Sequence, residues 1–438
     1  MSGMGLFDIF RIFLRKTKSL VFRMKARLQR TSFILACNGP AQIYFKDFLE
    51  KRNWQPVALR NLNDFAIESL NLFPASSSTV AAPCFNGQRV ASSSKTFPPL
   101  RAHVLQASGG SKLIASAYSP GVISEDDLLL PFHLVNSCNR VTTDGGGVFN
   151  LGDKFHVGCI RANVELKEGI LIGGAGAFNW YHFVVEVLPK AFLSKNLPSQ
   201  FDRLPLLVPD ECRRFPSFSS ALEHFSSGRP LQFIQKGDLV GVERLIVFDE
   251  PSIGPFNLIA GEWPRVEDYA QHDAFLRSFF EEFRSKALKI GELKVKAKNP
   301  ERRIFLVRPG VRRNYNQDEL LAIALQYGFE PFSPEAFTLA QQAKIFSESS
   351  AVIGPSGAAW VGMIFREAPL HGLTWLPREY KSFCGYSNLA TLLGHRLNFI
   401  EAKTPRALRS TGEAYVSDYQ VCPIKFESAL KTLAEKNP

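Results

Sequence analysis

Three groups of residues in this sequence could carry chemistry. The first is the segment GPSGAA, which follows an apolar run and precedes a helical pattern. Small residues such as Gly354, Gly357 and Ala358 let the backbone come close to a ligand. The free N–H groups and dipole at a helix N-terminus attract phosphate, and Ser356 adds a hydroxyl donor. The segment is therefore a candidate phosphate site, with a tight strand-to-helix turn as the alternative.

The second group is a set of arginines. Arg308 directly follows the apolar run IFLV, and Arg312 and Arg313 lie in the loop after it. In a parallel sheet Arg308 would stand at the carboxyl end of its strand, where such sheets bind ligands. Guanidinium groups make fork-shaped contacts with a diphosphate. We expect these arginines to bind an anionic ligand; ordinary solvated surface charge is the alternative.

The third group lies in the segment NWYHFVVEVLPK. His182 and Glu186 are four residues apart, so on a helix they share one face. A reaction in which a hydroxyl attacks a carbon needs such a proton acceptor, because the hydroxyl loses its proton as it attacks. A histidine that is merely buried and satisfied in a core is the alternative, and Glu186 could simply orient its ring.

Glycines just before this segment invite a different interpretation. Gly174 and Gly176 begin a G-x-G-x-x-G pattern, but Asn179 stands where the third glycine belongs. The acidic residue expected at the end of a second strand is not evident either. A nucleotide-dependent oxidoreductase is therefore a minor alternative.

The elements that must position these residues alternate regularly in the second half of the chain. Apolar runs that indicate buried strands are separated by segments with helical periodicity at 316–328, 338–349, 360–365 and 386–395. Such alternation predicts a parallel sheet with helices on both faces. The first half shows the same pattern from about residue 169. We expect two α/β domains that face each other across a cleft.

The remaining segments set the expected boundaries. Short strands are predicted over 112–165, and the serine-rich stretches around 75–79 and 92–96 are expected to be surface loops. The charged segment 265–295 has a helical pattern and precedes a basic stretch. The predicted division is a helix over 1–30, an α/β domain over 31–295, a second over 296–405, and a segment over 406–438 that packs back on the first domain.

Positive charge is concentrated at the N-terminus. Residues 1–30 hold eight lysines and arginines against Asp8 alone, which is seven of the chain's eleven net positive charges. Apolar residues recur there every three or four positions, as in a basic amphipathic helix. Such a helix over residues 5–30 can lie on an anionic membrane surface or dock on the protein's own core. Because the remaining charge is unremarkable, we expect no nucleic-acid partner.

Cysteines and histidines show no metal-binding pattern. The seven cysteines are scattered, odd in number and without a C-x-x-C pair, which argues against a disulfide framework and a structural zinc site. No H-E-x-x-H motif is present. We therefore expect no metal and no cofactor. A reducing, cytoplasmic location is favoured, with possible association at the inner face of the cytoplasmic membrane.

The three groups together resemble glycosyltransferase family 61, which includes bacterial polysaccharide transferases. Its members carry N-Y-Y-H-x-x-x-[DE]-x-L-P-[RK], which NWYHFVVEVLPK matches closely. RPGVRRNYNQDEL looks like the family's arginine-bearing strand and helix start. QAKIFSESSAVIGPSGAAW is similar to its Q-x-x-x-F helix followed by I-G-P-H-G-A-G-L. The order and spacing agree across residues 170–377, roughly half the chain.

The resemblance implies a GT-B fold of two Rossmann-type domains and an inverting, metal-independent transfer from a nucleotide sugar to a carbohydrate or lipid-linked acceptor. By position, Arg308, Arg313, Ser356, Gly357 and Ala358 would contact the donor in the C-terminal domain, with Gln342 supporting that side. His182 and Glu186 would lie on the acceptor side. We expect one of these two to be the base, with Asp144 in TTDGGG in reserve.

Two departures from the family pattern motivate a second hypothesis. Ser356 replaces the family's usual histidine, and Thr374-Trp375 stands where the family often has a glutamate. An inactive scaffold or glycan-binding subunit of a polysaccharide assembly complex is therefore the alternative to an active transferase.

Overall fold

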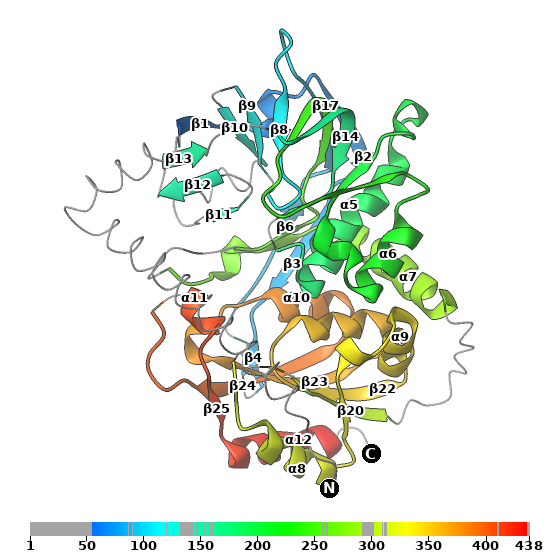
Figure 1. Cartoon of the computed structure of the whole chain (residues 1–438). Coiled ribbons are helices and arrows are strands. Elements are labelled where there is room, and N and C mark those ends of the chain that lie inside the picture. Colours follow the sequence, from blue (N-terminus) through cyan, green and yellow to red (C-terminus); the bar gives the residue numbers. More distant parts are fainter. Residues whose placement is uncertain are drawn as a thin grey trace, which may run out of the picture. The chain divides into compact units, whose positions relative to one another are not determined.

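The computed structural model describes residues 55–435, with gaps of which the longest are 132–143 and 291–301. The helix expected over 1–30 and Arg312 lie outside the described residues. The chain forms two compact units, residues 1–56 with 156–159 and residues 57–155 with 160–438. The account below concerns the second unit, a mixed α/β structure (Figure 1). No described helix has the length and apolar character that crossing a membrane requires.

The second half of the chain forms the parallel sheet that the alternation predicts. Its strand order is β21-β20-β22-β23-β24, and each neighbouring pair is parallel. The chain leaves β20 toward β21, then returns past β20 to β22 and continues to β23. Ligands of open α/β sheets bind at the carboxyl ends of two such strands whose connections diverge, here β20 and β22. The strands are β20 (Arg302–Leu306), β21 (Glu330–Phe332), β22 (Ser349–Ile353), β23 (His371–Pro377) and β24 (Arg396–Lys403).

Helices cover both faces of this sheet because successive strand residues point to opposite sides. Phe305 packs with Leu320 of α8 (Gln317–Gln326) and Phe426 of α12 (Pro423–Glu435) in one apolar cluster. Ile304 and Leu306 belong to another cluster, with residues of α9 (Leu339–Ser347), the 3₁₀ helix Ala358–Phe365 and α10 (Gly385–Leu392). Figure 1 shows α8 and α12 together on one side of the strands. The predicted doubly covered sheet is confirmed.

The first half contains a second set of parallel strands. Their order is β16-β15-β14-β17, and all three neighbouring pairs are parallel. The chain leaves β14 toward β15 and β16 and then returns past β14 to β17. The connections out of β14 and into β17 thus lie on opposite sides of β14, so these two carboxyl ends form a second ligand-binding position of the same kind. The strands and the helices that follow them are β14 (Val164–Leu171), α4 (Trp180–His182), α5 (Leu188–Leu193), β15 (Leu206–Pro209), α6 (Pro216–Phe225), β16 (Leu231–Ile234), β17 (Val240–Phe248) and α7 (Asp273–Ile290).

Antiparallel strands extend this first sheet beyond β17. Both β7 and β8 pair antiparallel with β17, and β2 pairs with β7. The strands expected over 112–165 are present here, although they are short: β8 (Leu113–Ala115), β9 (Val122–Ser124), β10 (Asp127–Leu130), β11 (Asp144–Gly145), β12 (Val148–Leu151) and β13 (Lys154–Val157). The sheet also contains β2 (Glu68–Phe73), β7 (Leu100–Gln106) and β1 (Gln55–Asn61), which pairs in parallel with β10. Strands β18 (Ser252–Ile253) and β19 (Ala270–Gln271) form a separate antiparallel pair.

The serine-rich stretches are strands, so the expectation of surface loops was wrong. Strands β3 (Ser76–Ala81) and β6 (Ser92–Phe97) pair antiparallel along their whole length. Their hydroxyls are partly used in hydrogen bonds. Ser78, fully buried, accepts from the backbone N–H of Gln271 at 2.9 Å. The hydrogen-bond partner of this buried hydroxyl is almost two hundred residues away in the sequence, so the local sequence pattern does not reveal that the serine is buried.

The helix that the spacing of His182 and Glu186 requires is present but irregular. Asn179 caps it by accepting the N–H of Tyr181 at 2.9 Å. A π-helical turn over Phe183–Val187 then interrupts the α-helical pattern before α5. Such turns insert one extra residue and are frequent at functional sites.

The C-terminal segment packs on the second sheet, which corrects the expectation that it returns to the first domain. Strand β25 (Gln420–Val421) pairs with β24, and α12 packs against α8. Leu430 and Phe426 of α12 are fully buried in the cluster that covers Phe305. The sheet would otherwise expose this face, so α12 completes its burial. The short helix α11 (Thr411–Ala414) precedes these elements.

A strand from the first half joins the same sheet. Strand β4 (Cys84–Phe85) pairs in parallel with β24, and β5 (Gln88–Arg89) pairs with β4. The expected boundary at residue 295 therefore does not separate the chain's contacts cleanly, because both sheets lie within one compact unit.

Candidate active site

Arg308 and Arg313 meet Ser356 at the carboxyl ends of β20 and β22. The Nη2 of Arg308 donates to the carbonyl oxygen of Ser356 at 2.6 Å. The Nη2 of Arg313 donates to the Oγ of the same serine at 3.2 Å. Arg308 and Arg313 therefore lie beside the GPSGAA segment, although the arginines and this segment belong to separate loops.

Two glycines of this segment make room for the arrangement. A Cβ at Gly354 would stand 2.5 Å from the Cβ of Leu306, so any larger residue would push β22 away from β20. A Cβ at Gly357 would lie 3.2 Å from the Nη2 of Arg308. The glycines thus permit close packing of the strand and of a guanidinium. The helix that begins at Ala358 is a 3₁₀ helix.

The two arginines lack an acidic partner. In the described part of the chain, neither guanidinium lies within ion-pair distance of a carboxylate, and the side-chain bonds of Arg308 go to carbonyls and a hydroxyl. Burial, and then the positive charge of Arg308, lower the pKa of Arg313. The Nε of Arg313 is buried without a hydrogen-bond partner among the described atoms. Two neighbouring cations without a counter-charge form a site for an anion.

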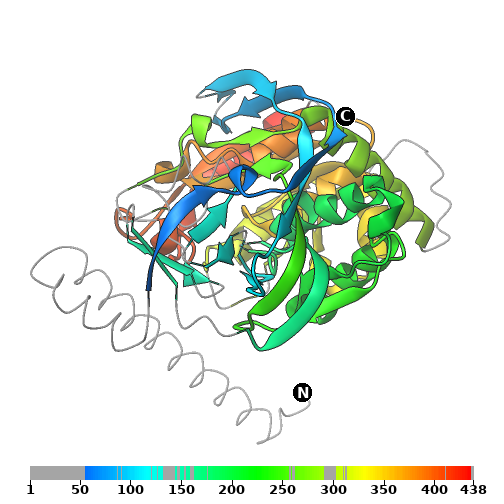
Figure 2. The same cartoon turned by 90° about the horizontal axis from the view of Figure 1, so that it is seen from above.

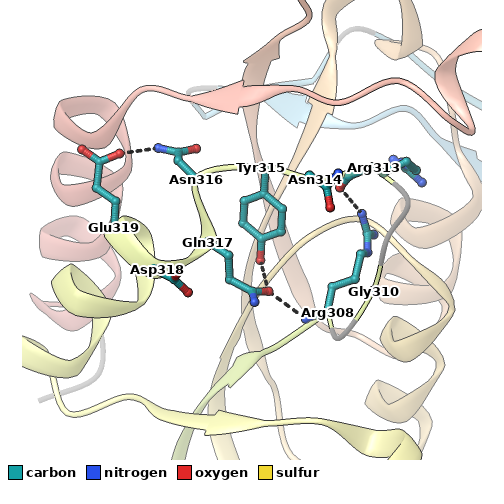
Figure 3. A pocket seen from close by; sticks show the side chains of 9 residues that line it. All are labelled: Arg308, Gly310, Arg313, Asn314, Tyr315, Asn316, Gln317, Asp318 and Glu319. Atoms are coloured by element: carbon teal, nitrogen blue, oxygen red, sulfur yellow. Dashed lines mark hydrogen bonds between the residues drawn. The ribbon is translucent and has the colours of Figure 1, made fainter. Parts of the chain in front are cut away.

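A cavity of about 270 Å³ opens beside the arginines. Figure 3 shows Arg308 and the first residues of α8 around it, with Gln317 accepting from the backbone N–H of Arg308 at 2.8 Å. A second, smaller space of about 30 Å³ adjoins Arg313 and Ser356 and is rimmed by rings. These rings are Tyr380, Phe383, Tyr386 and Tyr415. The arginines therefore stand between a polar cavity and an aromatic one.

Ser356 and Trp375, which depart from the family pattern, both form hydrogen bonds within this site. The hydroxyl at 356 binds Arg313, as described. Trp375 donates from Nε1 to the hydroxyl of Tyr419 at 3.2 Å, and Arg308 donates to the same hydroxyl at 3.2 Å. Thr374 is fully buried, and its Oγ1 has no hydrogen-bond partner among the described atoms. Trp375 and Tyr419 thus help to hold Arg308.

His182 and Glu186 form the contact that their spacing predicts. The His182 Nδ1 and the Glu186 Oε1 are 2.8 Å apart, and each side chain is about one-quarter exposed, at 24% and 22%. With the proton on Nδ1, the ring donates to the carboxylate and leaves the lone pair on Nε2. A histidine oriented by a carboxylate is suited to accept a proton from a hydroxyl.

A pair of tyrosines connects the histidine to the arginine site. The ring of Tyr181 meets that of His182 edge to face at 5.5 Å and that of Tyr386 at 5.3 Å. Its hydroxyl donates to the carbonyl of Gly385 at 3.0 Å. Since Tyr386 also lines the aromatic space beside Arg313, the two candidate groups are neighbours through these rings.

The other candidates are distributed differently. Asp144 lies in β11, and its side chain is outside the described part of the structure. Gln342 is buried and donates to the carbonyls of Pro334 and Phe337 and to the hydroxyl of Ser217. Its amide is thus committed to holding α9 against a turn and α6. Among the described residues, no three histidine, cysteine or acidic side chains gather closely enough to hold a metal ion.

Several residues of the site were missed in the sequence. Tyr419, Tyr386 and Trp375 carry no local pattern that marks them as ligand-side residues. Glu250, directly after β17, could have been found, because an acid at the carboxyl end of a buried parallel strand is the same signal that singled out Arg308. Its contacts are described below.

Both the arginine pair at the edge of the second sheet and the histidine–carboxylate pair lie in a segment that matches a known family of enzymes. Residues 180–371 match the family described as Glycosyltransferase 61, so this part of the chain is a glycosyltransferase domain of that family. The match includes His182, Glu186, Arg308, Arg313 and Ser356 but not Asp144. No curated protein matches the sequence.

Proposed function

We propose that the protein transfers a sugar from a nucleotide-sugar donor to a carbohydrate or lipid-linked acceptor, with inversion at the anomeric carbon and without a metal ion. In this proposal the two sheets act as the Rossmann-type domains of a GT-B enzyme. The second sheet holds the donor, and the helix that carries His182 faces the acceptor.

The arginine pair, which has no carboxylate partner among the described residues, is the observation that carries this proposal. A nucleoside diphosphate has about two negative charges, and each guanidinium offers several N–H donors to phosphate oxygens. Arg308 and Arg313 would supply the positive charge that the leaving diphosphate needs. The cavity beside them, lined by Asn314 and Gln317, would accept the nucleoside.

The histidine–carboxylate pair supplies the proton acceptor in this proposal. Nε2 of His182 takes the proton of the acceptor hydroxyl while its oxygen bonds to the anomeric carbon. The bond from that carbon to the diphosphate breaks, and the nucleoside diphosphate leaves with the electron pair. Glu186 stabilises the imidazolium that forms. Asp144 stays in reserve as an alternative base. One direct displacement places the new bond on the opposite face of the sugar.

The biological setting is also a proposal. Assembly of a capsular polysaccharide, exopolysaccharide or other glycoconjugate at the inner face of the cytoplasmic membrane fits the basic amphipathic pattern of residues 5–30.

Thermal shift against nucleoside diphosphates and nucleotide sugars, with and without magnesium, tests the proposal. Ligand that binds only the native state stabilises it by about 2.7 kcal/mol at a hundredfold excess over Kd. A magnesium-independent shift that is lost in Arg308→Ala supports the proposal. The matched control is Arg396→Ala, which should keep the shift. Arg396 is exposed and begins β24, so it lies at the amino end of the sheet, whereas Arg308 follows the carboxyl end of β20. No shift with any compound would favour the inactive scaffold.

A further inference from the structure

Lys190 and Glu250 form a buried ion pair at the second ligand-binding position of the fold. The Nζ of Lys190 donates to the Oε1 of Glu250 at 2.9 Å and to the carbonyl oxygen of Gly173 at 2.8 Å. The Lys190 side chain is 4% exposed and that of Glu250 12% exposed. Gly173 follows β14 and Glu250 follows β17, the two parallel strands whose connections diverge.

The pair ties together three parts of the acceptor-side sheet. Lys190 extends from α5, Glu250 from the end of β17, and Gly173 from the turn that leads into the helix of His182. A Cβ at Gly174 would lie 3.7 Å from the Nζ, so this turn passes closely over the ammonium. Burying two charges is costly unless they pair and form further hydrogen bonds, as they do here.

Electrostatic interaction also shows that Glu250 is near the histidine–carboxylate pair. Burial raises the pKa of Glu250, the ammonium of Lys190 opposes this, and the negative charges of Glu186 and Asp249 raise it further. Glu186 is therefore within electrostatic reach of Glu250.

We propose that Glu250 is a positioning residue for the transfer reaction: through Lys190 it fixes the turn after β14 against the helix of His182. The inference rests on the proposed function. It assigns to the end of β17 a role that neither the family match nor the residue pattern contains.

Glu250→Gln tests this in the full chain, because it keeps the size of the side chain and removes the charge. We expect kcat for the nucleotide sugar that gives the largest thermal shift to fall about 10-fold or more, with KM for that donor little changed, as for other residues that orient a reacting group. Glu250→Asp, which keeps the charge, should restore part of kcat. Unchanged kcat in Glu250→Gln would overturn the proposal.

A measurement without substrate separates this inference from the proposed function. The NMR signals of the His182 ring report the environment and the order of that ring. In Glu250→Gln these signals should shift or broaden, because the ion pair that ties the turn after β14 to α5 is lost. Unchanged ring signals would contradict the positioning role. A native chain that turns over no nucleotide sugar would refute the transfer itself, while the ring signals would still decide the positioning.

Two further variants keep the test decisive. Glu282→Gln removes the carboxylate that pairs with Lys195 and Lys286 at the surface of α7, and it should change neither kcat nor the His182 ring signals. If Glu250→Gln does not fold, Lys190→Met combined with Glu250→Gln removes both charges and leaves neither unpaired. In that double variant, a donor-induced thermal shift with reduced kcat supports the positioning role, and full kcat overturns it.

Discussion

Arg313 and Ser356 are 43 positions apart and share a hydrogen bond of 3.2 Å between the guanidinium Nη2 and the serine Oγ. The serine stands where the family pattern that the sequence resembles has a histidine, so at this position a small hydroxyl supports a cation. The backbone of Arg313 has a φ of 58°, in the left-handed region that non-glycine residues rarely adopt. Such strain is found where the surrounding structure holds a residue for function.

Ser356→Ala should weaken binding of the nucleotide. The hydroxyl contributes one hydrogen bond to a charged partner, worth roughly 1 kcal/mol, so we expect Kd to rise about 3- to 10-fold by titration calorimetry. Ser350→Ala is the matched control: Ser350 lies in β22, the strand that precedes Ser356, and its hydroxyl donates to the carbonyl of Arg302 at the other end of the sheet. Equal effects of the two variants would contradict a role for Ser356.

His182→Gln should abolish most of the transfer while leaving donor binding intact. Loss of a general base typically lowers the rate about 10²- to 10⁴-fold. Glu186→Gln should have a smaller effect, because the histidine keeps its lone pair. Steady-state assays of nucleoside diphosphate release measure both. His224→Gln, on exposed α6, should be neutral. If His182→Gln kept full activity, His182 would not be the base, and Asp144 would be the next candidate.

Gly173→Ala and Gly174→Ala should differ sharply in stability. A Cβ at Gly173 would lie 2.1 Å from the carbonyl oxygen of Ala117, a backbone atom that cannot rotate away. We expect a loss of about 3 kcal/mol in the free energy of unfolding, measured by urea denaturation. At Gly174 the nearest atom is the end of Lys190 at 3.7 Å, an ordinary contact. Similar stabilities for the two variants would show that this turn relaxes easily.

Stability should fall in mild acid because of His395. Burial lowers the pKa of His395 to about 4, and its ring accepts from the N–H of Leu370 and donates to the carbonyl of Met363. The folded state therefore holds the ring neutral, while the unfolded chain takes up a proton near its ordinary pKa of about 6.5. The ring's contribution is complete above that pH and is lost as the pH falls toward 4, by roughly 3 kcal/mol.

Urea denaturation at several pH values checks this dependence. His395→Gln can accept and donate at the same two positions without titrating, so its stability should depend less on pH between about 6.5 and 4. If the free energy of unfolding of His395→Gln depended on pH as steeply as that of the native protein, other titratable groups would be the cause of the acid sensitivity. His272 is one such group, since burial also lowers its pKa.

The local patterns of the sequence determined the elements and several contacts. The alternation after residue 300 predicted the parallel sheet with covered faces, because buried strands and amphipathic helices each have their own apolar period. The spacing of His182 and Glu186 predicted their 2.8 Å contact, which depends only on helix geometry. The position of Arg308 directly after a strand predicted that it would stand at the ligand-binding edge.

Tertiary structure decided what distant segments contribute. Tyr419 reaches Arg308 from 111 positions away, and Glu250 meets Lys190 across 60. The serine-rich strands and the C-terminal helix were misplaced for the same reason: their partners are chosen by the burial of a whole sheet. Periodicity shows which side of an element is buried, but it does not show against what. Pairing of that kind is determined only when the complete chain has folded.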